Sequence, residues 1–348
     1  MTTNIQQAVK GIVEATTILS PTAFVFCGEN YPVFPVTAHG LPGFPNHPLP
    51  SNPLVRTLQS VLYARCYSRR LEDGAPPNTA PVSGWDAGFV QQMSAANQTQ
   101  SRWEGGWTIY AAMPTGQVSL IKGDRQRSAV PGEFIYSGPP GVGPQTGAIV
   151  SVQAARESTT AQPGFYFVYG ETLSDMWDDH ALLRFYFHAS SAGAPELIAY
   201  VTSNLNRYQV PFQMKALNHP VAYQRTDAIV LYVAKRYHDI CVRVVRQLPS
   251  TVRAGLRPDI PLFTERVVEG VGLAEEPNTG ESFGMHRCRM VAEGIVNAWM
   301  KGDQTTEGCC SEIAECFRQN GFDLERPSLA PGSVELPQVS EEVNFSYA

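Results

Sequence analysis

The sequence predicts an α+β fold with N-terminal helices, a β-rich middle segment and a mixed sheet with a βαβ unit flanked by helices. Three observations predict it. Residues 4–18 and 53–66 carry apolar side chains at helical spacing. Residues 102–170 contain short strand-like runs separated by Gly- and Pro-containing turns. From residue 184 onward, strand-like and helix-like segments alternate, which is typical of βαβ units.

The N-terminal half supplies clear boundary signals. Ser51-Asn52-Pro53 combines a capping residue with a proline, which predicts a helix start. Pro114-Thr115-Gly116 predicts the turn of a hairpin, and the runs FIYSG, AIVSVQA and FYFVYG predict further strands. We therefore expect an N-terminal helical region at 1–75, an α+β catalytic region at 76–325 and a polar tail at 326–348.

The segment from Arg184 to Leu217 predicts the βαβ unit. A strand ending near His188 is followed by a helix opened by Pro195 and by the strand FQMKAL. Such a unit implies parallel neighbouring strands, with ligands beyond their carboxyl ends. Because alternate strand residues share a face, we expect Arg184, Tyr186 and His188 to point the same way. Gln213 and Lys215 would then lie on the neighbouring strand. Further along, we expect a strand at 228–234, a helix over DICVRVVRQL and a helix beginning near Ser282.

Bulk composition narrows the class of protein. The chain has 348 residues, of which 43% are hydrophobic and 17% charged, as in ordinary globular proteins. A net charge of −6 argues against general nucleic-acid binding, which needs a concentrated basic surface. No apolar run approaches the roughly 20 residues that span a bilayer, and the N-terminus does not resemble a secretory signal. We therefore expect a cytoplasmic protein that binds neither nucleic acid nor membrane.

The spacing of cysteines and histidines in the sequence does not predict a metal site. Seven scattered cysteines, an odd number, favour reduced thiols, and the cluster Cys309, Cys310 and Cys316 favours helix packing because it lacks a CxxC pair. His39 and His47 lie in a Pro-rich loop without flanking carboxylates, which favours ordinary loop residues over metal or substrate ligands. We expect no metal and no cofactor.

A long string of motifs resembles the HopA-type effector family. It comprises RFYFH, LNRYQVPFQMKALN, YQRTDAIVLYV, PLFT, GVGLAE and GESFGMHRCR, and the N-terminal LYARCYSR, RWEGGWTIY and FYFVYG are similar too. The resemblance implies a lyase partner of an aminoglycoside-phosphotransferase-like kinase in peptide natural-product biosynthesis. The kinase would phosphorylate Ser or Thr of a precursor peptide. The lyase would then eliminate phosphate to give dehydroalanine or dehydrobutyrine, as in class V lanthipeptides and thioamitides.

The layout RFYFH, helix, PFQMK is also similar to phosphothreonine lyases of the OspF and SpvC type, which use a Lys base and a His acid. Elimination needs a base for a weakly acidic Cα proton. Lys215 is the candidate base, since an amine desolvated beside other cations loses its proton more readily; the alternative is a solvated surface lysine. His188 is the candidate acid, and His286 is the reserve candidate. The alternative for His188 is an ordinary histidine at the end of a strand, with its hydrogen bonds made within the protein. Tyr186 would orient the base or the phosphate, unless it only packs.

The phosphate-binding candidates are four arginines: Arg184, Arg225, Arg287 and Arg289. A guanidinium group can donate two parallel hydrogen bonds to two oxygens of one phosphate. The helix N-terminus at 280–282 could add amides beside Arg287. The alternative for each is a surface ion pair, and Asp227 is expected to partner one arginine. The predicted function is thus a phosphoserine/phosphothreonine lyase that acts on a precursor peptide. The alternative is a non-catalytic type III effector-like or leader-peptide-binding interaction protein, and dispersed histidines leave little support for a metal hydrolase.

Overall fold

The computed structural model describes residues 4–34, 51–73, 84–123, 125–139, 142–174, 178, 181–277 and 279–333. Three antiparallel sheets and several helices occupy these residues, so the predicted α+β class is confirmed. The expectations for His39 and His47 fall outside the described residues. No described helix is both long and apolar enough to cross a membrane.

The central sheet has seven strands in the order β14-β15-β11-β13-β12-β10-β9. Every neighbouring pair runs antiparallel. The strands are β9 (Glu157–Ser158), β10 (Phe165–Tyr169), β11 (Leu182–Phe187), β12 (Phe212–Leu217), β13 (Ile229–Ala234), β14 (Glu265–Val268) and β15 (Val271–Glu275).

The expected pairing of β11 with β12 is wrong. Helix α4 (Ala194–Arg207) does carry the chain from β11 to β12, and both strands run antiparallel to β13 and so share one direction. However, β13 lies between them. Five of its six residues are buried and a short connection joins it to β12, so it fits the sheet interior, where it pairs on both edges. The rule that places ligands beyond parallel strand ends therefore does not apply here.

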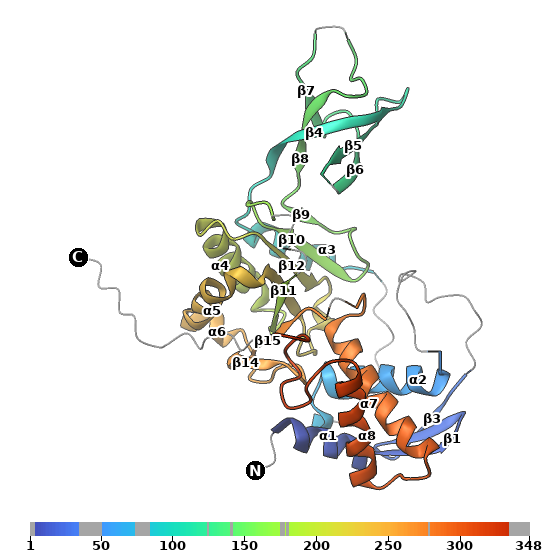
Figure 1. Cartoon of the computed structure of the whole chain (residues 1–348). Coiled ribbons are helices and arrows are strands. Elements are labelled where there is room, and N and C mark those ends of the chain that lie inside the picture. The colour runs from blue at the N-terminus through green and yellow to red at the C-terminus, as the bar shows by residue number, and fades with distance from the viewer. Residues whose placement is uncertain are drawn as a thin grey trace.

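Helices cover the central sheet unequally (Figure 1). One face packs against α3 (Ala87–Ala96), α4, α5 (His238–Arg246) and α6 (Ser250–Ala254), which together enclose the larger hydrophobic core. On the other face, Tyr186, Val230 and Ala274 pack into a second core with α2 (Pro53–Leu62) and α7 (Phe283–Met300). The strands at the β10 and β12 side of that face contribute no buried residue to this second core.

The N-terminal region is less helical than expected. Helix α1 (Asn4–Glu14) ends early, and a three-stranded sheet follows: β1 (Thr16–Ser20), β2 (Ala23–Phe26) and β3 (Glu29–Pro32). The β-branched pair at 16–17 favours a strand over a helix. The predicted helix start is confirmed, since the Asn52 side chain accepts a hydrogen bond from the Leu54 amide at 2.9 Å. Helix α8 (Thr306–Gln319) packs against α7 and α1, and it buries Cys309 and Cys316.

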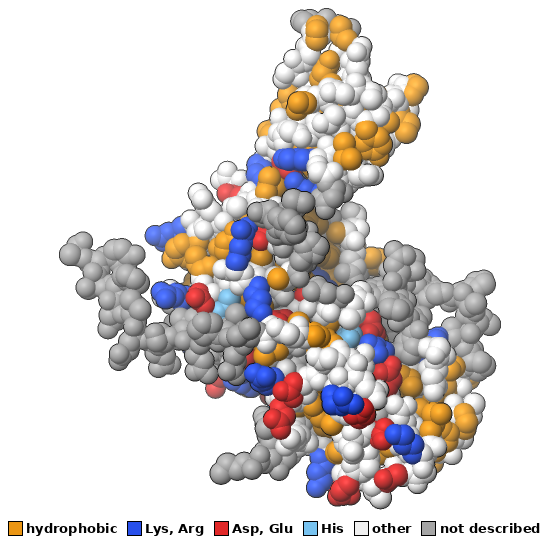
Figure 2. Space-filling model, in the orientation of Figure 1, with side chains coloured by type: hydrophobic (Ala, Val, Ile, Leu, Met, Phe, Trp, Pro, Cys, Tyr) orange, Lys and Arg blue, Asp and Glu red, His pale blue; other side chains and the backbone are white. Residues whose placement is uncertain are grey.

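A separate five-stranded sheet projects from the rest of the protein (Figure 1). Its order is β6-β5-β4-β8-β7, around a small core that includes Trp107, Ile109 and Val152. The hairpin expected at 114–116 is confirmed, with Gly116 at a φ of 83°. The strands are β4 (Arg102–Ala112), β5 (Val118–Lys122), β6 (Arg125–Ala129), β7 (Phe134–Tyr136) and β8 (Ile149–Ala154). Figure 2 shows hydrophobic side chains gathered on this projecting sheet.

Residues 327–333 do not form a separate polar tail. The Ser328 carbonyl accepts a hydrogen bond from the Glu275 amide of β15 at 2.8 Å. The Pro327 and Leu329 carbonyls accept hydrogen bonds from Arg287 of α7. The described part of the predicted tail is therefore bound to the central sheet and to α7.

Candidate functional site

Strand register places three predicted site residues on one face of the central sheet. Tyr186 of β11 lies opposite Val230 of β13, which lies opposite Lys215 of β12. Arg184 begins the adjacent row, opposite Tyr232. Directly paired residues of neighbouring strands point to the same face, so Arg184, Tyr186 and Lys215 share one face of the sheet, whereas His188, which was expected on the same strand face, lies beyond the end of β11. Both rows continue into β10, through Phe167 and Tyr169.

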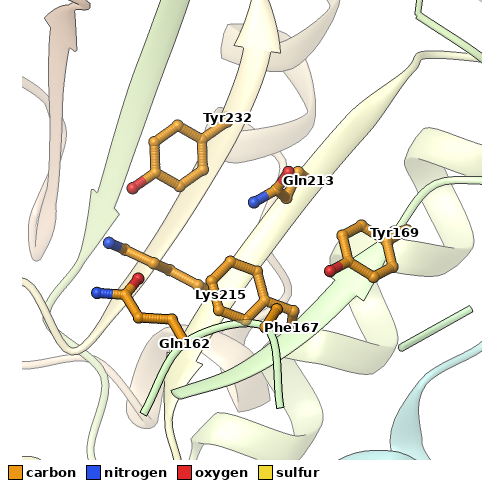
Figure 3. A pocket seen from close by; sticks show the side chains of 7 residues that line it. Gln162, Phe167, Tyr169, Gln213, Lys215 and Tyr232 are labelled. Atoms are coloured by element: carbon orange, nitrogen blue, oxygen red, sulfur yellow. The ribbon is translucent and has the colours of Figure 1, made fainter. Parts of the chain in front are cut away.

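The uncovered side of this face forms an open pocket of about 460 Å³ (Figure 3). Strands β10, β12 and β13 supply its floor, and the segment before β10 supplies one edge. Its lining residues are Ala161, Gln162, Phe167, Tyr169, Gln213, Lys215 and Tyr232. The pocket thus combines aromatic rings and carboxamides with one amine.

Lys215 is the cation at the centre of this pocket. Its Nζ lies 4.7 Å from the ring centroid of Phe165 and 5.7 Å from that of Tyr232. Figure 3 shows the side chains of Gln162 and Tyr232 directed toward the amine. With the residues that the structure describes, Nζ makes no ion pair, and its charge is met by aromatic faces instead. The amine is therefore accessible to a ligand in the pocket.

Arg184 lies against the ring of Tyr232 and forms an ion pair with Glu276. Its Nε donates to Glu276 Oε2 at 2.5 Å, and its guanidinium carbon lies 5.2 Å from the Tyr232 ring centroid. The Tyr232 ring is thus in contact with both Arg184 and Lys215. An arginine held by a carboxylate contributes positive charge to the site, but it has fewer donors left for a phosphate.

Tyr186 carries a buried hydroxyl group without a hydrogen-bond partner among the described residues. Burial raises its pKa to about 12, so it stays protonated at neutral pH. The ring of Tyr67 packs edge-on against it at 6.3 Å, and the Tyr67 hydroxyl is also buried and unpaired in this part of the structure. The two hydroxyl groups interact with each other, and burial raises the pKa of both, so both stay protonated.

Asp227 links Arg225 to the rest of the site. Arg225 donates from Nε to Oδ1 at 2.8 Å and from Nη2 to Oδ2 at 2.7 Å. Tyr63 accepts from Arg225 Nη2 at 2.8 Å and donates to Asp227 Oδ2 at 3.1 Å. Burial alone would raise the pKa of Asp227, but Arg225, Tyr63 and Lys215 together hold it below its ordinary value. Asp227 is therefore ionised, and it is close enough to Lys215 to interact with its charge.

His188 is buried just beyond the end of β11. Its Nδ1 lies 3.2 Å from the carbonyl oxygen of Asp259, which can only accept, so Nδ1 carries the ring proton of the neutral form. Burial, followed by the positive charge of Arg257, lowers its pKa below the ordinary value. The imidazole is therefore neutral at pH 7, which does not favour the predicted role as general acid.

Arg287, Arg289 and the reserve candidate His286 do not line this pocket, although Arg287 is close enough to Tyr186 and Tyr67 to interact with both electrostatically. Arg287 is fully buried and donates to the carbonyl oxygens of Pro327 at 2.7 Å and Leu329 at 3.1 Å. These contacts occupy Nε and Nη2 of Arg287, and its Nη1 is bound to His286 Nδ1 at 2.8 Å, so the buried guanidinium has no exposed donor for a phosphate. Arg289 is held in ion pairs by two glutamates, Glu281 just before α7 and Glu293 on it. Burial and Arg287 lower the pKa of His286 to about 3, which leaves it neutral.

Sequence reasoning missed the segment that completes the site. Tyr63 and Tyr67 belong to a π-helix, η1 (Tyr63–Tyr67), and their rings stack at 5.2 Å. π-Helical turns occur often at functional sites. Arg69 follows directly. The signal was the run LYARCYSRR, which places two tyrosines four residues apart beside three arginines.

Among the described residues, no group of three or more His, Cys, Asp or Glu side chains could hold a metal ion. The site as described therefore consists of Lys215, buried tyrosines and the pair Arg225–Asp227. These residues bring together an amine, buried hydroxyl groups and an arginine–carboxylate pair.

Comparisons with known proteins place the chain in a family. Two solved structures are similar: an effector protein from Pseudomonas syringae pv. tomato strain DC3000 and one from Pseudomonas syringae pv. syringae strain 61. The first has 14% identity and a TM-score of 0.40, and the match covers 72% of this chain and 86% of that one. The second has 16% identity and a TM-score of 0.41, with 78% and 88% covered. No curated protein matches. The model of the HopA1 effector protein family matches residues 156–329, half of the chain, and the chain belongs to this family.

Proposed function

We propose that this protein is a phosphoserine/phosphothreonine lyase that acts on a phosphorylated precursor peptide. The observation that carries the proposal is the amine of Lys215, which lies in an open pocket without a carboxylate partner among the described residues. Two arginines add positive charge nearby: Arg184 on β11 and Arg225 in the loop before β13. A base beside cations is the arrangement that elimination of an anionic leaving group requires.

In the proposed step, Lys215 in its neutral form removes the Cα proton of the phosphorylated residue. The C–H electron pair becomes the new Cα–Cβ double bond, the Cβ–O bond breaks, and its electrons leave with the phosphate. The products are a dehydroalanine or dehydrobutyrine residue, inorganic phosphate and a protonated lysine. Nearby guanidinium groups stabilise the negative charge that grows on the leaving oxygen.

The reaction needs a phosphorylated peptide as its substrate, so a separate kinase must act first. We propose that this kinase is aminoglycoside-phosphotransferase-like and that the product belongs to lanthipeptide or thioamitide biosynthesis, as the sequence resemblance implies. No cofactor takes part in the proposed step, because phosphorylation has already converted the hydroxyl group into a good leaving group.

The experiment is to incubate the purified protein with a phosphothreonine peptide and with the same peptide unphosphorylated. We expect phosphate release together with a dehydrobutyrine peptide, identified by mass spectrometry and by addition of a thiol to the new double bond. Release of phosphate with recovery of threonine would show hydrolysis instead, and it would contradict the proposal, as would an unchanged phosphopeptide in the presence of the kinase.

A second candidate is a non-catalytic interaction protein, which the description of the matched family as effector proteins favours. The projecting sheet, outside the matched residues, also exposes large apolar side chains: Trp103, Tyr110, Met113, Ile135 and Ile149. A protein that only binds a leader peptide or another protein would leave its partner chemically unchanged. It would yield no dehydrated product.

A further inference from the structure

We propose that Arg69, Arg225 and Arg257 form the phosphate subsite of this protein, around the loop at 223–227. The inference rests on the proposed function for the identity of its ligand, a phosphorylated residue of a peptide. Arg225 was a candidate from the sequence, whereas the other two arginines come from the structure. Together they would receive the leaving group while Lys215 takes the proton.

Backbone contacts bring Arg69 beside Arg225. The Thr226 amide donates to the Ser68 carbonyl at 2.9 Å, and the Thr226 hydroxyl donates to the Tyr67 carbonyl at 3.0 Å. Arg69 and Arg225 each adjoin a residue of this junction. Their relative placement is therefore set by main-chain hydrogen bonds that follow directly on the π-helix.

Arg69 is a cation with no hydrogen bond or ion pair to any part of the chain that the structure describes. It is only partly exposed. Burial, and next the positive charge of Arg225, lower its pKa, and Asp73 offsets this only in part. Two neighbouring guanidinium groups repel each other, and an anion between them would remove that repulsion. Arg69 is thus placed for a ligand rather than for a contact within the protein.

Arg257 contacts the same loop. Its Nη1 donates to the Tyr223 carbonyl at 3.0 Å and to Gln224 Oε1 at 3.4 Å. Its own amide donates to the His188 carbonyl at 2.9 Å. These partners are neutral, so within the described residues the charge of Arg257 is not balanced by a carboxylate contact.

Among the described residues, two carboxylates close to these arginines are already ion-paired, and Asp73 accepts a hydrogen bond from the Arg70 amide at 3.3 Å. Asp227 is bound by Arg225, and Arg70 pairs with Glu72 and Asp259. The chain as a whole carries a charge of −6. An excess of positive charge at one place in an acidic protein is a site for an anion, and a phosphate monoester carries about two negative charges at neutral pH.

Asp227 connects this subsite to the base. It is ion-paired with Arg225 at 2.7 Å and lies within electrostatic range of Lys215. A phosphorylated residue held by the three arginines would present its Cα proton toward the pocket in which Lys215 lies. Binding of the phosphate and removal of the proton would then be carried by different side chains, which makes them separable by mutation.

The test uses a peptide whose phosphothreonine is replaced by a phosphonate analogue, in which carbon replaces the bridging oxygen and elimination is blocked. Its binding to the full chain is measured by calorimetry at two salt concentrations. We expect Arg69→Gln and Arg257→Gln each to weaken binding about tenfold or more, because each removes a charged hydrogen-bond donor. They should also reduce the salt dependence. Arg69→Lys should keep part of the affinity, and thermal unfolding checks that each variant folds.

The control is Arg207→Gln, since Arg207 is an exposed arginine at the end of α4, which covers the opposite face of the sheet. Tight binding by folded Arg69→Gln and Arg257→Gln would overturn the inference, even if the wild-type protein eliminates phosphate. If the arginines bind the phosphonate but the wild-type protein never eliminates phosphate, the subsite stands and the proposed lyase function fails.

Discussion

Tyr186 and Lys215 lie in one row of the central sheet, on the same face, with only Val230 of β13 between them. Neighbouring strands are about 4.8 Å apart, so their Cα atoms are separated by about 10 Å. Both positions are fixed by the ladder hydrogen bonds of antiparallel strands. A buried hydroxyl group and an amine that lines the pocket are therefore held on one rigid scaffold.

Replacing Tyr186 by phenylalanine separates packing from chemistry. The hydroxyl is buried and has no partner among the described residues, so its removal should leave the free energy of unfolding unchanged or raise it by about 1 kcal/mol. If the hydroxyl orients the base or the phosphate, the elimination rate should fall about tenfold or more. Urea unfolding and the elimination assay measure the two effects. An unchanged rate would leave Tyr186 as a packing residue only.

Replacing Tyr63 by phenylalanine should weaken the Arg225–Asp227 pair. The Tyr63 hydroxyl contacts both partners, at 2.8 Å and 3.1 Å, and the change leaves those contacts unmade. We expect a loss of about 1–3 kcal/mol in the free energy of unfolding, measured by urea titration. Stability equal to that of the wild-type protein would show that the hydroxyl does not bridge the pair.

Gly284 provides a test of how Tyr67 is placed. A Cβ at this position would lie 2.3 Å from Tyr67 Cε1, so Gly284→Ala must displace the tyrosine ring from Tyr186. We expect a loss of about 1–3 kcal/mol in stability, together with lower elimination activity. Gly11→Ala is the matched control: its nearest neighbour would be 3.8 Å away, and alanine in a helix favours stability by about 1 kcal/mol. Equal effects of the two variants would contradict the close packing at Gly284.

His286 predicts a pH dependence of stability. Its pKa of about 3 in the folded protein lies below the ordinary value of 6.5, so below pH 6.5 the unfolded state binds a proton that the folded state does not. Stability should therefore fall as the pH drops from 6.5 toward 3, by at most about 1.4 kcal/mol per pH unit from this group. Unfolding free energies measured across this range check the slope. His286→Gln can still accept the Arg287 hydrogen bond and should reduce the slope; a slope identical to that of the wild-type protein would refute this.

Local sequence signals predicted those parts of the fold that depend on neighbouring residues. Asn52 and Pro53 marked a helix start, Gly116 marked a hairpin, and alternation placed Arg184 and Tyr186 on one face of a strand. The insertion of β13 between β11 and β12 was not predictable in this way. Strand order is decided by how apolar faces pack across the whole sheet, and a βαβ pattern looks the same with or without a strand in between.

The same limit explains the errors in the site. Arg287 lies in a motif that suggested anion binding, but its partners are carbonyl groups of Pro327 and Leu329, about 40 residues further along the chain. Arg69 was overlooked because its approach to Arg225 depends on a contact between Ser68 and Thr226. Lys215 was identified correctly as a cation within an apolar strand because that mismatch is local.

The most direct test of the account is the elimination rate of Lys215→Ala on a phosphothreonine peptide. Lys10→Ala is its control, since Lys10 is exposed on α1, where it pairs with Glu14 at 3.7 Å. If Lys215 removes the Cα proton, its variant should bind the phosphonate peptide as the wild-type protein does but lose at least about a thousandfold in elimination rate, while Lys10→Ala keeps full activity. Full elimination activity in Lys215→Ala would contradict the central claim.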